Sequence, residues 1–191
     1  MPPARNGVAV TLTVPLVPIT ATELDSLTPD RLLARSVSLI IRQFAVAGPE
    51  RSKEIVAGLD PVRGALFGYW VLHTHGGNAL TGFCAELPHR TVDPDFWALT
   101  ERSLLALGDG PLLEVFRRFQ REISRAQSAY RASTPVRGDW DGTTTGRMLD
   151  LLDRTAMREL DTAYRAAVPD SLARLGAYIR RNGTALFDVA A

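Results

Sequence analysis

The feature that most constrains this chain is a regular alternation of residues that begin helices and residues that end them. Proline is favoured in the first turn of a helix because the N–H that it lacks would have no partner there. A Thr or Asp placed before such a proline can accept hydrogen bonds from the remaining free N–H groups. Helix-starting residues stand at Thr28-Pro29-Asp30, Asp60-Pro61, Asp93-Pro94 and Pro111, and helix-ending glycines at Gly48, Gly76-Gly77 and Gly108. The alternation predicts a succession of short, separately capped helices.

Between these signals the apolar residues follow helical spacing, so we expect helices to fill most of the chain after residue 28. The segment that begins at Asp60-Pro61 carries large apolar groups on more than one face, which is typical of a central, buried helix. Further helices are expected over residues 50–57, 147–167 and 170–182, with a break at Pro169 and one long loop over 132–146. The sequence therefore predicts an all-α domain of about six to seven helices.

Residues 7–19 differ from the rest, because apolar residues occupy alternate positions from Val8 to Val14, as they would in a strand. Two prolines follow and would confine such a strand to a sheet edge or to an extended arm. Two interpretations remain open: a partly ordered tail that lies on the domain, or an arm that docks on a second subunit. We expect residues 1–27 to be an extended N-terminal arm, residues 28–191 to be a single α-helical domain, and any strand to fall within 7–19.

The composition excludes several classes of protein. With 191 residues, of which 46% are hydrophobic, the chain is long enough for one domain with its own core. Its net charge of +1 argues against a polybasic nucleic-acid binder and against a polyacidic surface that imitates DNA. One cysteine cannot form an internal disulfide, and no segment is typical of a signal peptide or long enough to span a bilayer. We therefore expect a cytoplasmic protein that has no membrane partner.

All three histidines and the only cysteine fall in one window and are the candidates for chemistry: His73, His75, Cys84 and His89. They could supply the nitrogen and sulfur ligands of a zinc site, which would make the protein a metal-binding enzyme or sensor. Their spacing is that of no zinc finger, ribbon or knuckle, and residues two apart on a helix point about 200° apart. In the structural alternative, His73 packs at a helix end, His75 lies in the turn, Cys84 is a core residue and His89 is exposed. A Cys–His hydrolase has less support, because no glycine-rich oxyanion loop follows Cys84.

A row of arginines is the candidate for nucleic-acid binding. Arg118, Arg121 and Arg125 fall on one face of the helix that begins near Pro111, with Arg117 beside them. Such a row could contact phosphates. Glutamates are interleaved with the arginines, however, which favours a solvated face held by local ion pairs.

Two stretches resemble a bacterial domain-of-unknown-function family whose best-known member is a DNA-mimic protein that binds a transcription factor. One is Tyr69-Trp-Val-Leu-His-Thr-His-Gly-Gly-Asn, which is similar to that family's Asn-Gly-Gly-Phe-type motif. The other is Leu160-Asp-x-x-Tyr164 … Leu175-x-x-Tyr178-Ile179-Arg180-x-Asn182 … Phe187, which is similar to its closing signature. The resemblance covers residues 65–187 and implies an all-α single domain, often a dimer, with a non-catalytic binding role.

The departures from that family limit what carries over. His75 replaces the motif's asparagine and Asn78 its phenylalanine, and the strongly acidic surface of the mimic is missing, so DNA mimicry does not transfer. We expect a non-catalytic module that binds another protein and forms a homodimer, with no cofactor and no complete catalytic constellation. A glycine pair lets the backbone approach a partner closely, so the predicted partner-binding residues surround it. They are His75, Gly76, Gly77, Asn78 and Phe83. The alternative is that the glycines only cap a helix.

Overall fold

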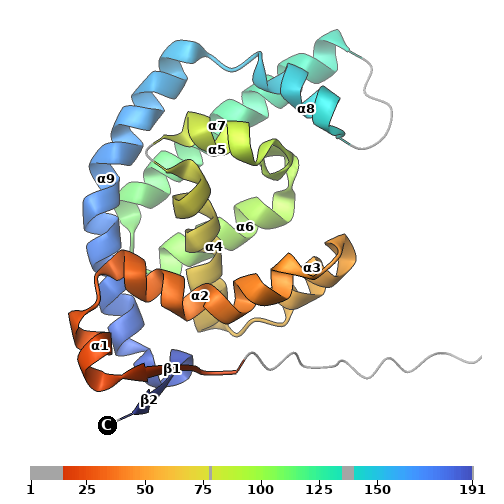
Figure 1. The fold of residues 1–191 in the computed structure, drawn as a ribbon. Coiled ribbons are helices and arrows are strands. Elements are labelled where there is room, and N and C mark those ends of the chain that lie inside the picture. Colours follow the sequence, from red (N-terminus) through yellow and green to blue (C-terminus); the bar gives the residue numbers. More distant parts are fainter. Residues whose placement is uncertain (1–14, 78, 135–139, 191) are drawn as a thin grey trace, which may run out of the picture.

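The computed structural model describes residues 15–77, 79–134 and 140–190, and within them the protein is almost entirely helical (Figure 1). These residues form ten α-helices, one 3-10 helix and a sheet of two short strands. In chain order the elements are β1 (Val17–Thr20), α1 (Ala21–Ser26), α2 (Pro29–Ala45), α3 (Pro49–Ala57), α4 (Pro61–Gly76), α5 (Leu80–Glu86), η1 (Pro88–Val92), α6 (Pro94–Ala106), α7 (Gly110–Ser133), α8 (Gly142–Leu149), α9 (Arg154–Arg181), α10 (Gly183–Leu186) and β2 (Phe187–Ala190). The all-α prediction is confirmed, but about six to seven helices is too few. The additional helices are short, such as α1, α5 and α10, and too few residues lie in each to show a helical period in the sequence.

The helices begin where the capping residues predict. Asp60 accepts hydrogen bonds from the N–H groups of Val62 and Arg63 at the start of α4. Asp93 and Asp109 cap α6 and α7 in the same way. Thr28 stands before α2, but its hydroxyl makes no capping hydrogen bond, so proline and Asp30 alone mark that start.

The predicted N-terminal arm is wrong for the part of it that the structure describes. Residues 17–20 form β1, which pairs in parallel with β2 and buries Val17 and Ile19, and α1 follows directly. Strand β2 also lies outside residues 7–19, the range in which the sequence predicts any strand. Only one of its four residues, Phe187, is buried, so no alternation marks it in the sequence. Residues 1–14 lie outside the described part.

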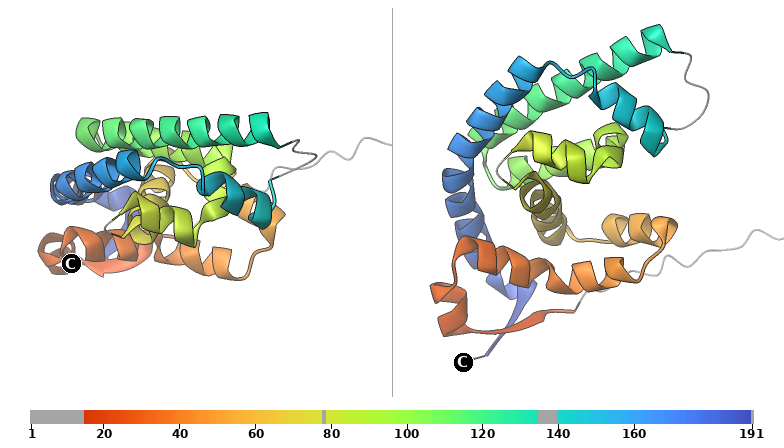
Figure 2. Two further views of the ribbon diagram at one scale, coloured as in Figure 1. Left: turned by 90° about the horizontal axis from the view of Figure 1, so that it is seen from above. Right: turned by 45° about the horizontal axis from the view of Figure 1, so that its top comes forward.

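Helix α9 continues through Pro169, where the sequence predicts a break between two helices. Proline there cannot donate a hydrogen bond to the carbonyl of Arg165, which costs a helix about 3 kcal/mol or more. Packing outweighs that cost, because α9 curves along α2, α5 and α7 and buries residues on both sides of the proline, among them Tyr164 and Leu175 (Figures 1 and 2). The predicted loop 132–146 is shorter than expected, since α7 extends into it and α8 begins at Gly142; residues 135–139 are not among those described.

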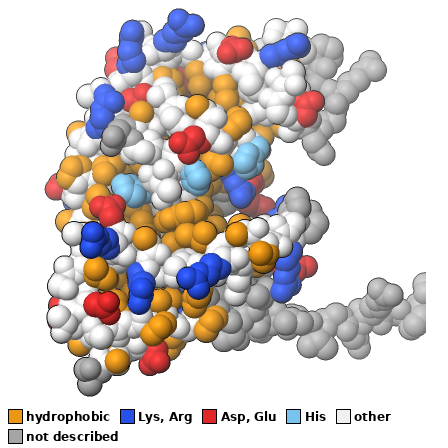
Figure 3. Space-filling view, in the orientation of Figure 1, with side chains coloured by type: hydrophobic (Ala, Val, Ile, Leu, Met, Phe, Trp, Pro, Cys, Tyr) orange, Lys and Arg blue, Asp and Glu red, His pale blue; other side chains and the backbone are white. Residues whose placement is uncertain are grey.

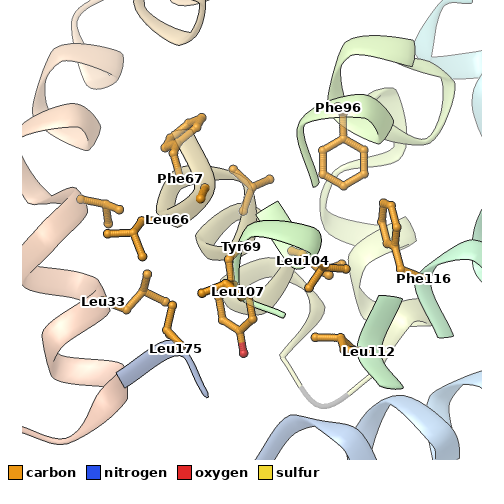
Figure 4. Packing of buried hydrophobic residues seen from close by; sticks show 14 of the residues in the cluster. Leu33, Leu66, Phe67, Tyr69, Phe96, Leu104, Leu107, Leu112, Phe116 and Leu175 are labelled. Carbon is orange, nitrogen blue, oxygen red and sulfur yellow. The ribbon is translucent and has the colours of Figure 1, made fainter. Parts of the chain in front are cut away.

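Helix α4 lies at the centre of the fold, as its apolar density predicts, with α2, α5 and α6 packed around it (Figure 1). Figure 4 shows Leu66, Phe67 and Tyr69 of α4 among the buried side chains of its neighbours. Burial among other helices accounts for the apolar character of α4. No helix in the described ranges combines the length and the apolar character that crossing a membrane would require.

Candidate functional site

The predicted turn lies at the end of α4, and its two glycines are required for different reasons. Gly77 has φ +51°, a conformation that residues with a side chain rarely adopt, and its N–H donates to the carbonyl of His73. Gly76 is buried, and a Cβ there would approach Tyr164 Oη to 3.0 Å. The glycine pair is thus a helix C-cap in part, and it also lets α4 pass close to α9.

Two of the residues predicted to bind a partner cannot be assigned to an exposed site. Phe83 is fully buried and stacks on Phe96 at 5.0 Å between ring centroids, so its role is in the core. A short helix, α5, turns this side chain inward immediately after the loop. Asn78 lies outside the described residues.

The histidines of the window each take a separate position on one face of the molecule (Figure 3). His73 Nε2 lies 2.9 Å from Asp30 Oδ1 on α2, and His75 Nδ1 lies 3.0 Å from Glu86 Oε2 on α5. His89 is on η1, where burial, with Arg90 adding to it, lowers its pKa. Nowhere in the described ranges do three or more His, Cys, Asp or Glu side chains come together as a metal site would need.

Cys84 is buried, whereas these three histidines are partly or fully exposed. Its removal from water, together with the nearby Asp161 carboxylate, raises the pKa of the thiol to about 12. The thiolate, which is the nucleophile and the metal ligand, is therefore scarce at neutral pH. The geometry gives this cysteine a structural position in the core.

A groove of about 410 Å³ adjoins the turn, between α2 and the C-terminal part of α4. We refer to it as the α2–α4 groove. Its lining combines apolar and polar groups: Asp30, Leu33, Ala34, Trp70, His73, Thr74 and Gly77. Figure 3 shows hydrophobic side chains gathered next to the histidines on this face. Two of the residues predicted from the sequence line the groove: Gly77, a predicted partner-binding residue, and His73, a candidate metal ligand.

Trp70 and Asp30 are two of the groove residues that the sequence did not predict as site residues. Asp30 precedes His73 by 43 positions, and no local pattern joins them. Trp70 is partly exposed in a helix whose other large side chains are mostly buried, and only the fold reveals that exception. An aromatic row holds its ring in place: Phe44 to Phe67 at 4.9 Å, Phe67 to Trp70 at 5.9 Å, and Trp70 to His75 at 5.7 Å.

The arginine row on α7 is matched by carboxylates. Arg117 binds Glu101 and Arg125 binds Glu122, each through two nitrogens. Arg121 lies 3.2 Å from Glu114 and Arg118 lies 4.0 Å from Glu159. These acidic partners offset the positive potential that binding to phosphates requires.

No protein-family model, no curated protein and no solved structure matches this chain.

Proposed function

We propose that this chain is a non-catalytic protein-binding module whose partner enters the α2–α4 groove and contacts the Gly77 turn. The observation that carries the proposal is a partly exposed tryptophan, held by an aromatic row, in a groove that ends at exposed backbone. Tryptophan is the residue most enriched among those that dominate binding energy at protein interfaces. The resemblance noted in the sequence supports the same role.

The chemistry of the groove supports binding rather than catalysis. An imidazole paired with a carboxylate, as in His73 and Asp30, can activate a nucleophile that lies next to it. Thr74 carries a hydroxyl in the groove lining, but His73 Nε2 is paired with Asp30 and His73 Nδ1 is buried without a partner among the described residues, so neither nitrogen holds a nucleophile. Cys84 is buried elsewhere. The pair is better explained as a contact that joins the ends of α2 and α4 and shapes the groove wall.

The test compares two tryptophans. Trp70→Ala removes the groove residue, while Trp140→Ala removes another partly exposed tryptophan, which packs on Tyr130 and Arg131 and does not line the groove. We expect the first variant to lose partners captured from native extract and the second to retain them. A dominant interface residue contributes about 2 kcal/mol or more, so the affinity of a purified partner should fall by roughly thirtyfold.

Amide hydrogen exchange, measured on the protein with and without its partner, locates the interface. Binding should slow amide exchange at the C-terminal end of α4 and at the start of α2, and leave α8 unchanged. Equal capture by both tryptophan variants, or protection confined to other helices, would contradict the proposal. Sedimentation of the wild type and of Trp70→Ala tests a second copy of the chain as the occupant; a dimer that Trp70→Ala dissociates would identify it.

A further inference from the structure

We infer that the α2–α4 groove recognises an arginine side chain of the partner protein. The inference rests on the proposed function and adds the chemistry that the groove selects. It is drawn from three features of the lining: a carboxylate, the end of a helix and an indole ring.

The first feature is the charge of the groove. Asp30 is a lining residue with 57% of its side chain exposed, and no lysine or arginine is among the residues that line the groove. Its Oδ1 faces His73 Nε2 at 2.9 Å, and its Oδ2 has no hydrogen-bond partner in the described part of the chain. One carboxylate oxygen is therefore held in place while the other is available to a cation.

His73 positions this carboxylate. Its Nδ1 is buried without a hydrogen-bond partner among the described residues. In the neutral ring the proton is therefore assigned to Nε2, which donates to Asp30, since a proton on Nδ1 would be a buried, unpaired donor. Stacking of Tyr69 on His73, with ring centroids 5.6 Å apart, further restricts the imidazole.

The second feature is the C-terminal end of α4. The backbone dipoles of a helix give its C-terminus a partial negative charge, which favours a cation within about one turn. Thr74 and Gly77 belong to this end and both line the groove. Their contribution has the same sign as that of Asp30.

The third feature selects arginine over other cations. Trp70 lines the same groove, and a guanidinium stacks on an indole face while its N–H groups bind a carboxylate. A lysine ammonium can bind one of these groups well but lacks the planar fork that suits both. The combination of a tryptophan and an aspartate in one groove thus fits an arginine best.

The experiment uses the full chain, labelled with ¹⁵N, and titrates it with N-acetyl-arginine amide as the probe. The neutral analogue N-acetyl-citrulline amide and N-acetyl-lysine amide are the matched probes. We expect saturable shifts of the Trp70 indole N–H and the Gly77 amide with the arginine probe, weaker binding of lysine and no binding of citrulline. Equal binding of the arginine and citrulline probes, or no saturable shift with arginine at tens of millimolar, would overturn the inference.

The matched variants are Asp30→Asn and Asp95→Asn. Both aspartates follow a proline in the first turn of a helix, but Asp95 belongs to α6 and is not a groove residue. Asp30→Asn should lower the affinity for the arginine probe by about tenfold, as expected for loss of a charge-assisted hydrogen bond. Asp95→Asn should leave that affinity unchanged. Asp30→Glu should restore part of the binding, and an unchanged circular dichroism spectrum identifies the folded variants.

The two proposals fail differently. If Trp70→Ala loses the partner but Asp30→Asn keeps both partner and probe affinity, the binding module stands and arginine recognition is wrong. If neither variant affects the partner, the groove is not the interface and both proposals fall.

Discussion

At the scale of single residues, burial lowers the reactivity of Cys84, the only cysteine of the chain. Burial raises the pKa of Cys84 to about 12, so at pH 8 its thiolate is far scarcer than that of a free cysteine. We expect iodoacetamide to modify Cys84 in the native protein at least roughly a hundredfold more slowly than in the unfolded chain. Mass spectrometry of the labelled protein, with and without guanidinium, measures both rates. Similar rates in the two conditions would show that Cys84 is accessible.

The site illustrates what residue-level reasoning can and cannot locate. The helix end at Gly76-Gly77 could be predicted from the sequence, because a glycine pair after an apolar helix is a local signal. The sequence cannot predict that Phe83 points into the core, since a phenylalanine in a short amphipathic segment can face either way. Nor can it join His73 to Asp30, because that contact depends on how α2 crosses α4.

At the scale of elements, the approach of α4 to α6 depends on Gly68. A Cβ at this position would clash with Ser103 Oγ and lie 3.0 Å from Leu99 Cγ on α6. Gly68→Ala should therefore lower the free energy of unfolding by about 1–3 kcal/mol, in spite of the better helix propensity of alanine. Urea unfolding measures this change, and Ser103→Ala in the same chain should recover part of the loss.

The same helix provides the control. At Gly64 an added Cβ would meet only Leu59 Cβ, at 4.0 Å. Gly64→Ala should thus be neutral or stabilise the protein by up to about 1 kcal/mol. If Gly68→Ala proves as stable as Gly64→Ala, the two helices do not depend on a glycine at their contact.

Element boundaries were predictable where they depend on neighbours in sequence. Asp60 and Asp93 cap the residues directly after them, so the starts of α4 and α6 follow from local chemistry. The continuity of α9 through Pro169 and the existence of β2 depend on packing against distant parts of the chain. Local patterns carry no information on those contacts, and both predictions were wrong for that reason.

At the scale of the whole molecule, Arg180 holds the segment around α1 against the C-terminal part of α9. Its guanidinium donates to the backbone carbonyls of Leu24, Asp25 and Leu27, at the end of α1 and just after it. Because these bonds are exposed, we expect Arg180→Ala to cost only about 1 kcal/mol of global stability, but to accelerate amide exchange in α1. Hydrogen exchange with mass spectrometry resolves the two effects.

The neighbouring Arg181 is the control for this prediction. It lies over the ring of Tyr178 and makes none of these bonds to α1. Arg181→Ala should leave amide exchange in α1 unchanged. Arg180→Lys should restore little of the slow exchange of the wild type, because an ammonium lacks the planar fork that reaches several carbonyls. Equal amide exchange in α1 for Arg180→Ala and Arg181→Ala would show that the hydrogen bonds of Arg180 do not hold α1 in place.

The pairing of β1 with β2 has a consequence for biosynthesis. Strand β1 is synthesised before the ten α-helices of the described chain, and its partner β2 is synthesised after them. At ordinary rates of translation that delay is on the order of ten seconds. During it Val17 and Ile19, which are buried in the finished protein, have no partner strand, and the edge of β1 is open to other chains. The nascent chain is therefore open to misassembly at β1 until β2 has been made.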